Sequence, residues 1–288
     1  MMKEKTFFKV DEDKCIGCGM CTKVCPGEII NLDEKGKPVM KDFEEYGWNG
    51  CWKCEHCLAV CPKGAISIFN HNPEKSLKPI KEAEKVVDAL VANRHTCRRY
   101  LDEDVDKQTI DEMLTLLANA PNGGNKQQVE FTLVDNKEEL KEFRKIVYER
   151  MEELASNGIY PEGFDKRSYE DMKLWQRNVR PDMLFCGAPN LLISHAPIGK
   201  GEPVQDVIIA GTYFEILCNA RKLGCSMLTF PLAVLNTMPD IKGMLKIPEN
   251  HYIGMILGFG YPEIKYSRGV QKKMDEKRIH RPFCKTSR

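Results

Sequence analysis

The sequence lacks an excess of charge of either sign, and it lacks any long hydrophobic run. Its 288 residues include 43 Lys and Arg against 42 Asp and Glu, which leaves a formal net charge of +1. This balance argues against a nucleic-acid-binding protein that relies on a global positive field, and against a protein held to an anionic membrane by charge. No apolar run approaches the roughly 20 residues that span a bilayer, and no N-terminal apolar stretch is long enough for a signal peptide. We therefore expect a cytoplasmic protein whose partners include neither nucleic acid nor a membrane.

Two nucleotide-binding fingerprints are missing as well. The chain has neither a Gly-rich dinucleotide-binding motif nor a P-loop. What remains is an ordinary globular composition, with 42% hydrophobic and 30% charged residues. The length corresponds to about two domains.

Cysteine is the residue present in surplus. The chain has 13 cysteines, and because disulfides are rare in a reducing compartment, we expect these residues to bind metal or take part in redox chemistry. Eight of them lie between residues 15 and 61, in two runs of the form C-x-x-C-x-x-C-x-x-x-C-P. The other five have no ligand spacing and are interpreted as small core hydrophobes or incidental thiols: Cys97, Cys186, Cys218, Cys225 and Cys284.

The spacing of the two runs is typical of bacterial iron–sulfur proteins, in which the fourth cysteine serves the other cluster. Structural zinc is the alternative, but zinc completes its shell with four ligands and has no use for a third evenly spaced cysteine. We therefore expect two [4Fe–4S] clusters. One ligand set is Cys15, Cys18, Cys21 and Cys61, and the other is Cys51, Cys54, Cys57 and Cys25.

Residues 5–70 resemble the bacterial two-cluster ferredoxin domain through these runs. Two short alternating stretches, at 7–10 and 66–69, are expected to pair as a terminal ribbon that encloses the clusters. Trp48 and Trp52, beside the second run, depart from the ferredoxin pattern. They either shield that cluster from water or pack the small core, and packing is the favoured interpretation.

Helices and strands alternate beyond a polar, proline-containing stretch at 70–79. Apolar residues from Leu77 to Val91 recur at helical spacing, and Asp106 is a suitable N-cap for a second helix that stops before Pro121. The alternation predicts an α+β or α/β second domain, and the chain divides into residues 1–72, a linker at 73–79 and residues 80–288. Further helices are expected at 137–155, 165–180 and 203–223, and strands at 129–134, 190–196, 226–230 and 251–260.

Three segments of the second domain carry a resemblance: R-H-T-C-R-R-Y at 94–100, A-P-N-G-G-N-K-Q at 120–127 and G-F-G-Y-P at 258–262. In this order and separation they resemble the FMN-dependent nitroreductase family over residues 80–265. Taken singly, the first would usually be a solvated helix end and the second an ordinary turn. The resemblance implies an α+β fold with a mixed sheet flanked by helices, an obligate homodimer, and FMN at the subunit interface.

The resemblance also assigns cofactor-binding roles. The first segment would hold the flavin phosphate and ribityl chain, and the second would lie against the flavin. Arg98 would reach the N1–O2 edge of the ring, where its charge would stabilise the reduced flavin. Arg268 is the candidate that completes the phosphate site, with Arg278 and Arg281 behind it. The full set is Arg94, His95, Thr96, Arg98, Pro121, Asn122, Gly123, Asn125, Gln127, Thr229, Phe230, Leu232 and Arg268. No catalytic acid or base is assigned, because the chemistry is mainly the cofactor's own.

Several positions depart from the family pattern. Asn122 stands where serine is common, and Gln128 where proline is frequent. The window 229–232 should face the flavin, where a backbone N–H usually donates to N5. Pro231 has no N–H, so the donor is expected to be a neighbour such as Leu232, or to be missing. His195, inside an apolar strand, is interpreted as a satisfied core histidine rather than a catalytic base.

Two one-electron clusters joined to a two-electron flavin predict an oxidoreductase. Electrons would pass between the clusters, FMN and a small electron-poor organic acceptor of the nitroaromatic, quinone or activated-alkene type, by ping-pong transfer at flavin N5. The alternative is an electron-transfer partner protein, in which FMN interconverts one- and two-electron steps for another enzyme. Redox sensing or flavin handling without turnover is a third possibility. The direction of flow stays open, as does the donor, which is NADH, NADPH, or a ferredoxin or other redox protein.

Overall fold

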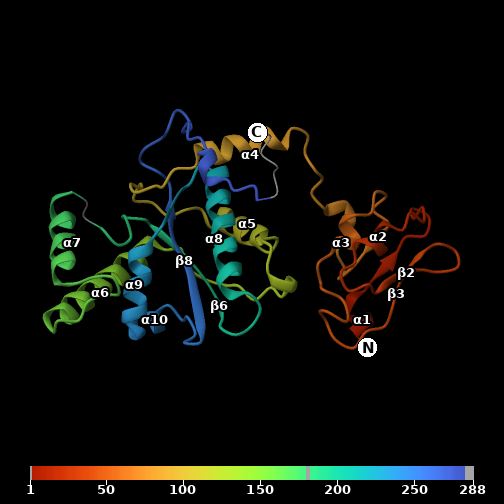
Figure 1. The fold of residues 1–288 in the computed structure, drawn as a ribbon, viewed down its shortest axis with the longest axis horizontal. Helices are drawn as coiled ribbons and strands as arrows, with labels where there is room; N and C mark the ends of the chain where they lie inside the picture. Colours follow the sequence, from red (N-terminus) through yellow and green to blue (C-terminus); the bar gives the residue numbers. More distant parts are fainter. Residues whose placement is uncertain (1, 180–181, 283–288) are drawn as a thin grey trace.

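The structure is a computed structural model that describes residues 2–179 and 182–282. Figure 1 shows a small N-terminal part, in red and orange, which is joined through helix α4 (Ala83–Asn93) to a larger part built around a sheet. Among the helices of the described residues, none is both long and apolar enough to cross a membrane.

Two short helices in the N-terminal part carry the third cysteine of each run. α2 (Met20–Lys23) contains Cys21, and α3 (His56–Ala59) contains Cys57. Each helix follows a residue with a left-handed backbone, Gly19 with φ 69° and Glu55 with φ 58°. A residue in this conformation turns the chain sharply, so the two runs adopt the same local shape.

Two antiparallel strand pairs complete this part. β1 (Lys9–Val10) pairs with β4 (Ile66–Ser67), so the expected terminal ribbon is confirmed. β2 (Ile30–Leu32) pairs with β3 (Pro38–Met40), and helix α1 (Met2–Thr6) precedes them all. The apolar side chains buried among these elements include Ile29, Ile30, Met40, Phe43, Leu58, Ile66 and Ile68.

Helix α4 has no buried residue. The apolar spacing that starts at Leu77 predicted a helix here, but the helix begins later, at Ala83, after a short 3-10 turn at Pro73–Lys75. Val86, Val87 and Val91 are 49%, 54% and 62% exposed. Most of this apolar face is therefore uncovered within the described chain.

The sheet of the larger part has four strands in the order β5-β6-β8-β7, and neighbouring strands are antiparallel. β6 and β7 run in the same direction, with β8 between them. Helix α8 (Pro203–Ala220) makes the crossover from β6 to β7, and β8 fills the gap, which is a split βαβ arrangement. The insertion of β8 removes direct parallel pairing between these strands, and the parallel contact of the expected mixed sheet is the isolated bridge between Thr96 and Cys225 of β7. The strands are β5 (Glu130–Val134), β6 (Asn190–Pro197), β7 (Gly224–Met227) and β8 (His251–Gly260).

Most helices of this part lie where the sequence predicts them. Asp106 caps the second helix, with its carboxylate accepting from the N–H of Thr109 at 2.9 Å. α8 ends at Ala220, earlier than expected, because Gly224 already begins β7. The confirmed helices are α5 (Lys107–Leu117), α6 (Lys137–Ser156) and α7 (Lys166–Asn178).

The strand expected at 226–230 is wrong in its second half. β7 ends at Met227, and Thr229 begins helix α9 (Thr229–Thr237), which is followed by α10 (Pro239–Met244). Pro231 explains the difference, because proline fits the first turn of a helix, where its missing N–H is not needed, but interrupts a strand.

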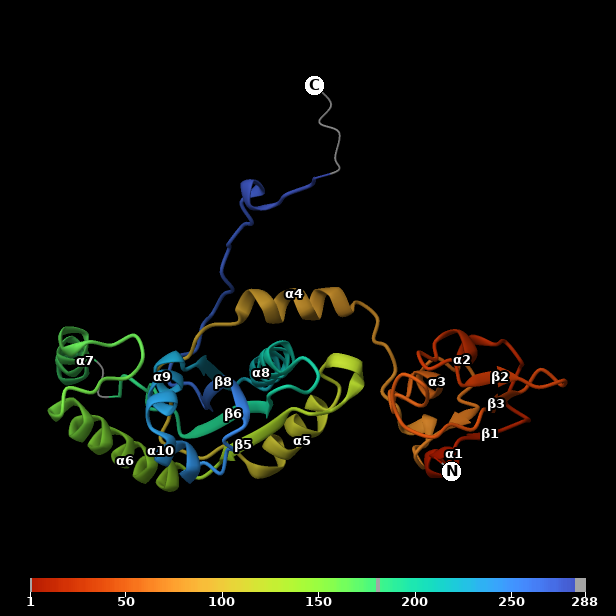
Figure 2. The same cartoon turned by 60° about the horizontal axis from the view of Figure 1, so that its bottom comes forward.

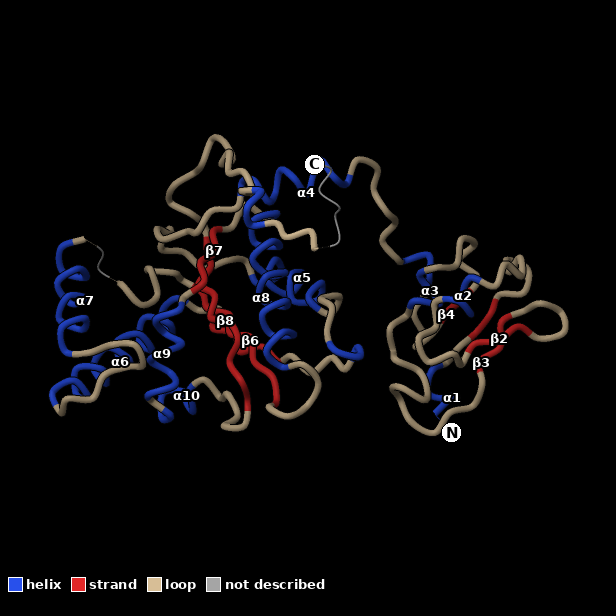
Figure 3. The backbone as a smooth tube through the Cα atoms, in the orientation of Figure 1, coloured by secondary structure: helices blue, strands red, loops and turns tan. Residues whose placement is uncertain are grey.

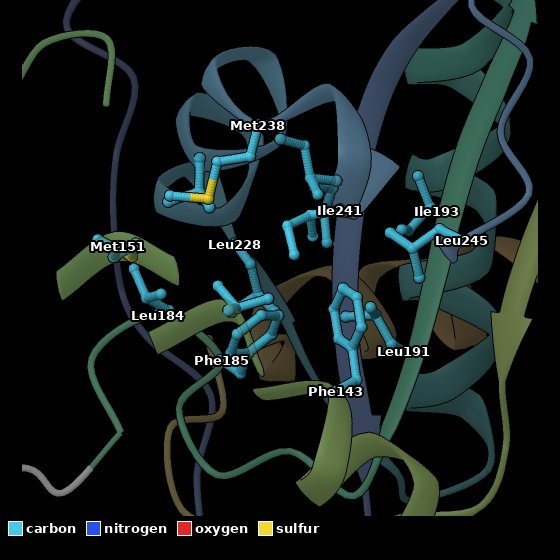
Figure 4. Close-up of a cluster of buried hydrophobic side chains, with 14 of the residues drawn as sticks. Phe143, Met151, Leu184, Phe185, Leu191, Ile193, Leu228, Met238, Ile241 and Leu245 are labelled. Atoms are coloured by element: carbon cyan, nitrogen blue, oxygen red, sulfur yellow. The ribbon is translucent and has the colours of Figure 1, made fainter. Parts of the chain in front are cut away.

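Helices cover both faces of the sheet (Figure 3), with α6, α9 and α10 on one side and α5 and α8 on the other. Leu191 and Ile193 of β6 pack with Phe143 in one apolar cluster, while Leu192 packs with Phe214 in the other. This alternation follows from the two-residue period of a strand. Figure 4 shows the first cluster, where side chains from the sheet and from the covering helices meet.

Candidate functional site

The eight cysteines of the two runs enclose two separate cavities. The first is lined by Cys15, Cys18, Cys21 and Cys61. The second is lined by Cys25, Cys51, Cys54 and Cys57. The structure therefore brings together the same two sets of four that the spacing predicts, with the fourth cysteine of each run placed among the first three of the other.

Burial sets the state of the thiols in the second cavity. It raises the pKa of Cys51 and Cys54 above the ordinary value, and it raises the pKa of Cys57 to about 12. As bare thiols these groups would be neutral near pH 7, and they become thiolates when a metal supplies compensating charge.

Backbone N–H groups already donate to the cysteine sulfurs. The N–H of Lys53 donates to Cys51 Sγ at 3.4 Å, and that of Ala65 donates to Cys61 Sγ at 3.2 Å. Hydrogen bonds of this kind tune the reduction potential of a cluster. Four converging thiols and N–H donors to sulfur make each cavity a fit for an iron–sulfur cluster.

Trp52 lines the second cavity. Its indole Nε1 is buried and has no hydrogen-bond partner among the described residues, and a cluster sulfur would supply an acceptor. Trp48 is 77% exposed and meets Trp52 edge to face, with ring centroids 4.8 Å apart. The packing interpretation is therefore wrong for Trp48, and Trp52 shields the cavity.

The segment 94–100 runs beside the edge strand β7 and is anchored there. Thr96 bridges to Cys225, and the N–H of Cys97 donates to the Cys225 carbonyl at 2.9 Å. The hydroxyl of Tyr100 donates to the carbonyls of Cys97 and Gly258, at 3.1 and 3.0 Å as alternative acceptors. Burial raises the pKa of Tyr100, so this anchor stays protonated. The backbone that carries the arginines is fixed by these contacts.

Two candidate phosphate-binding side chains have partners within the chain. Arg94 Nη1 lies 3.1 Å from Glu215 Oε1 on α8. The ring of His95 stacks on Tyr266, with centroids 3.8 Å apart and planes inclined by 4°. A bound phosphate would therefore share Arg94 with Glu215, a residue that the sequence patterns did not single out.

The C-terminal tail crosses the end of α4. The N–H of Val270 donates to the carbonyl of Ala92 at 3.0 Å. Arg268 lies between this contact and the stacked tyrosine, so the structure brings it to the segment 94–100. Arg278 and Arg281 lie farther along the tail, which Figure 2 shows extending away from the sheet.

The segment 121–127 forms a tight loop at the N-terminal end of α8. The N–H of Gly123 donates to Asp206 Oδ1, and that of Gln127 donates to Asn122 Oδ1, both at 2.9 Å. Asn125 and Gln127 have left-handed backbones, with φ 51° and 52°. Asp206 is 5% exposed and was missed by sequence reasoning. The sequence feature that could have identified Asp206 is a single carboxylate in the first turn of a largely apolar helix.

Asn125 reaches the N-terminal part. Its side-chain amide donates to the carbonyl oxygen of Trp52 at 2.8 Å. Pro121, at the start of the loop, is exposed. The loop expected against the flavin is therefore bonded to the wall of the second cysteine cavity.

Thr229, Phe230 and Leu232 lie in the first turn of α9. The N–H of Leu228 is already bonded to a carbonyl of β8, Pro231 has no N–H, and that of Leu232 is the first with an acceptor inside the helix. The N–H groups left without a helical partner are those of Thr229 and Phe230. The structure thus offers two donors at this helix start, and Leu232 is not one of them.

Arg98 and Arg99 line an open cleft. Asp182, which also lines the cleft, accepts from the Tyr148 hydroxyl at 2.7 Å and from the Gly187 N–H at 2.9 Å. The two arginines share the cleft with two acidic residues, Asp182 and Glu263, so its lining carries charges of both signs. The other lining residues are Tyr100, Val179 and Cys186.

His195 lies in the buried strand β6, and burial lowers its pKa to about 4. It therefore stays neutral near pH 7, in agreement with its interpretation as a core histidine. Among the cysteines outside the runs, three are buried and Cys186 is partly exposed, while Cys284 lies outside the described residues. The buried three are Cys97, Cys218 and Cys225.

Comparisons with known proteins agree with both parts. Residues 91–261 match the nitroreductase family, and residues 14–66 match the 4Fe–4S dicluster domain. An uncharacterized ferredoxin of Methanocaldococcus jannaschii is 44% identical over 68 residues, which cover 23% of this chain and 82% of that protein.

Two solved structures show the fold of the larger part. A nitroreductase with bound FMN from Bacteroides fragilis has a TM-score of 0.53 and 18% identity, and the match covers 70% of this chain and 98% of that one. A nitroreductase with bound FMN from Desulfitobacterium hafniense has a TM-score of 0.52 and 19% identity, and covers 70% and 99%.

The two cysteine-lined cavities and the α+β domain that follows them define an iron–sulfur oxidoreductase. The chain belongs to the nitroreductase family, and its N-terminal part is a 4Fe–4S dicluster ferredoxin domain.

Proposed function

We propose that this protein is an FMN- and [4Fe–4S]-dependent oxidoreductase that passes electrons between its two clusters, FMN and a small electron-poor organic acceptor. Nitroaromatics, quinones and activated alkenes make up the acceptor class. The observation that carries the proposal is the 2.8 Å hydrogen bond from Asn125 to Trp52, which joins the expected flavin loop to the wall of the second cluster cavity. FMN, when bound, supplies the conversion between one- and two-electron steps.

The residues of this chain fit FMN in charge and in donors. Arg94, Thr96 and Arg268 would hold the phosphate, since guanidinium and hydroxyl groups are the donors that a phosphate takes. Arg98 would place its charge at the pyrimidine edge of the ring. The unpaired N–H groups at the start of α9, where the helix dipole is positive, would donate to the ring nitrogen N5.

The ferredoxin domain supports one order for the electron path. The first cavity lies at the surface, where Cys18 is exposed and Ile16 is 61% exposed. The second cavity is the one bonded to the flavin loop through Trp52. The first cluster would therefore exchange electrons with an external donor, and the second with FMN.

A second copy of the chain would complete the flavin site. Apolar residues on the solvent-facing half of α8 are 39–43% exposed, and α8 contacts the uncovered α4; exposed apolar surface of this kind can mark an interface. The two flavin segments bond to different points of α8, at Asp206 and at Glu215. A homodimer would cover the exposed apolar residues of α8, which are Val204, Ile208, Tyr213 and Ile216.

Anaerobic reconstitution with iron, sulfide and FMN tests the proposal. The purified protein should hold about eight irons and one FMN per chain. Stopped-flow reduction by NADH, NADPH and reduced ferredoxin, followed separately at flavin and cluster wavelengths, identifies the donor. Oxidation of the reduced protein by a nitroaromatic, a quinone and an activated alkene then tests the acceptor class.

Zinc in the cysteine sites and no flavin would overturn the proposal. Reduction by ferredoxin alone, with no turnover of any small acceptor, would instead favour the electron-transfer partner protein. Rapid reduction of the flavin by NADH or NADPH would count against that alternative.

A further inference from the structure

Three potential metal ligands lie together on neighbouring strands of the sheet, and none of them belongs to the cysteine runs or to the flavin segments. Glu130 of β5 is paired across the sheet with His195 of β6, and His251 begins β8. One ligand atom from each of the three lies within 4.8 Å of the other two. Both histidines are buried, at 3% and 7% exposure, whereas Glu130 is exposed.

We propose that Glu130, His195 and His251 form a binding site for a divalent transition-metal ion. Two imidazole nitrogens and one carboxylate oxygen are ligands that zinc and iron(II) take in proteins, and three protein ligands leave a further position for water. The exposed carboxylate gives the ion a route in from solvent.

The tautomer of His195 leaves the correct nitrogen free. The hydroxyl of Thr132 lies 3.2 Å from the Leu245 carbonyl oxygen and 3.1 Å from His195 Nε2; when it donates to the carbonyl, its oxygen accepts from His195 Nε2–H. The lone pair of a neutral His195 then lies on Nδ1, which is 2.9 Å from His251 Nδ1. Such a bond to the second ring nitrogen is the usual way in which a protein orients a metal-binding histidine.

An irregularity in the strand β6 affects the orientation of the His195 ring. The register between β6 and β8 shifts between Ser194 and His195, which is a bulge or irregularity of the kind that re-aims a side chain. Two nitrogens on one tetrahedral zinc ion are about 3.3 Å apart, so the rings need to separate by only a few tenths of an ångström. The Glu130 carboxylate must move closer to the two histidine nitrogens. No ion pair opposes this movement, because Glu130 makes none among the described residues.

One cation lies near the site without occupying it. Lys242 of α10 donates to the carbonyl oxygens of Glu249 and His251, at 3.1 and 3.3 Å. Its ammonium group is therefore held by backbone oxygens and leaves the carboxylate of Glu130 unpaired.

Zinc binding by the full-length, cluster-loaded protein tests the proposal. The protein is given one equivalent of Zn²⁺ anaerobically and passed through a gel-filtration column, after which zinc per chain and X-ray absorption at the zinc edge are measured. We expect about one zinc per chain, with nitrogen and oxygen neighbours at about 2.0–2.1 Å. No retained zinc, or a sulfur shell at about 2.3 Å, which would place the ion among the cysteines, overturns the proposal.

Variants separate binding from folding. Glu130→Gln removes an exposed ligand and should weaken zinc binding at least tenfold, while Glu162→Gln, an exposed carboxylate elsewhere, should leave it unchanged. Thr132→Val should weaken binding about 10- to 100-fold by freeing the His195 ring, and Thr132→Ser should restore it. Unchanged affinity in both Glu130→Gln and Thr132→Val would show that the histidines form only an N–H···N hydrogen bond, and the proposal would fail.

Discussion

The side-chain amide of Asn125 donates to the carbonyl oxygen of Trp52 at 2.8 Å, across 73 residues of sequence. Trp52 directly follows Cys51, which lines the second cluster cavity, and Asn125 belongs to the loop expected against the flavin. The contact is formed by a residue with a left-handed backbone, φ 51°, a conformation that asparagine and glycine tolerate best. One polar contact thus links the two redox parts of the chain.

Removal of this contact should slow electron transfer between the parts. In Asn125→Gly the left-handed backbone is kept and the amide is lost. A hydrogen bond of this kind stabilises an arrangement by about 0.5–1.5 kcal/mol, so the rate of flavin reduction through the clusters should fall about two- to tenfold. Stopped-flow absorbance at cluster and flavin wavelengths measures the rate.

Asn70→Gly is the matched control, because Asn70 also has a left-handed backbone, φ 61°, and lies in the ferredoxin domain away from the contact. It should leave the rate unchanged. An Asn125→Gly protein that keeps both its FMN content and its original rate would show that the contact plays no part in the transfer.

The two parts of the chain differ in how much the sequence could predict. The cluster cavities follow from local spacing, because Cys15, Cys18 and Cys21 are drawn together by one tight curl around Gly17 and Gly19, both left-handed. The placement of the fourth cysteine of each run in the cavity of the other run was predicted too, since it belongs to the same repeated pattern. Short-range geometry is what a sequence encodes most directly.

Longer-range relationships could not be predicted in this way. The sequence predicted the helix α4 but held no sign that its apolar face lacks a partner in the described chain. The first turn of α9 resembled a continuation of the strand β7, because the apolar residues Leu228 and Phe230 fit the spacing of a strand as well as that of a helix. Pairing of Arg94 with Glu215 and of Gly123 with Asp206 depends on where α8 packs, which no local motif specifies.

Loss of iron should reveal which cysteines share a cluster. Cys18→Ala and Cys61→Ala, whose sulfurs line the same cavity, should each lose about four irons per chain. The double variant Cys18→Ala/Cys61→Ala should lose no more than either single variant, because both ligands serve one cluster. Cys18→Ala/Cys25→Ala should lose about eight, since Cys25 lines the other cavity.

Iron and acid-labile sulfide measured after anaerobic purification check this non-additivity. Cys218→Ala is the control, because Cys218 is buried in the larger domain and should retain full iron. If Cys18→Ala/Cys61→Ala lost all the iron, the swapped assignment would be wrong.

The packing of α8 on β8 depends on a glycine. A Cβ at Gly254 would overlap the side chain of Val207, so Gly254→Ala should lower the free energy of unfolding by about 1–3 kcal/mol through overpacking. A Cβ at Gly243, which is exposed in α10, would meet no atom within 4 Å. Gly243→Ala should therefore stabilise the protein by about 0.5–1 kcal/mol through helix propensity. Thermal unfolding of the two variants, with opposite shifts in Tm, checks the pair; a Gly254→Ala protein as stable as the unsubstituted one would contradict this account of the packing.

The proposed homodimer, if it divides the flavin site between two copies, has a consequence that can be counted. Arg94 pairs with Glu215, whereas Gly123, the neighbour of Asn122, bonds to Asp206. Because a helix rises 1.5 Å per residue, the two segments contact α8 at points about 14 Å apart. If one copy contributes Arg94 and its partner contributes Asn122, then Arg94→Ala and Asn122→Ala homodimers should both bind FMN poorly. A mixed dimer would contain one site with both substitutions and one site with neither.

Co-refolding equal amounts of the two variants should therefore restore about a quarter of the FMN sites, because half of the dimers are mixed and each has one intact site of two. Bound FMN after gel filtration, measured by its absorbance following release from the protein, gives the count. A mixture of Arg94→Ala with itself at twice the concentration is the control and should restore none. If both segments acted within one copy, every chain in the mixture would carry a defect in its own site, and FMN binding would stay at the level of the separate variants.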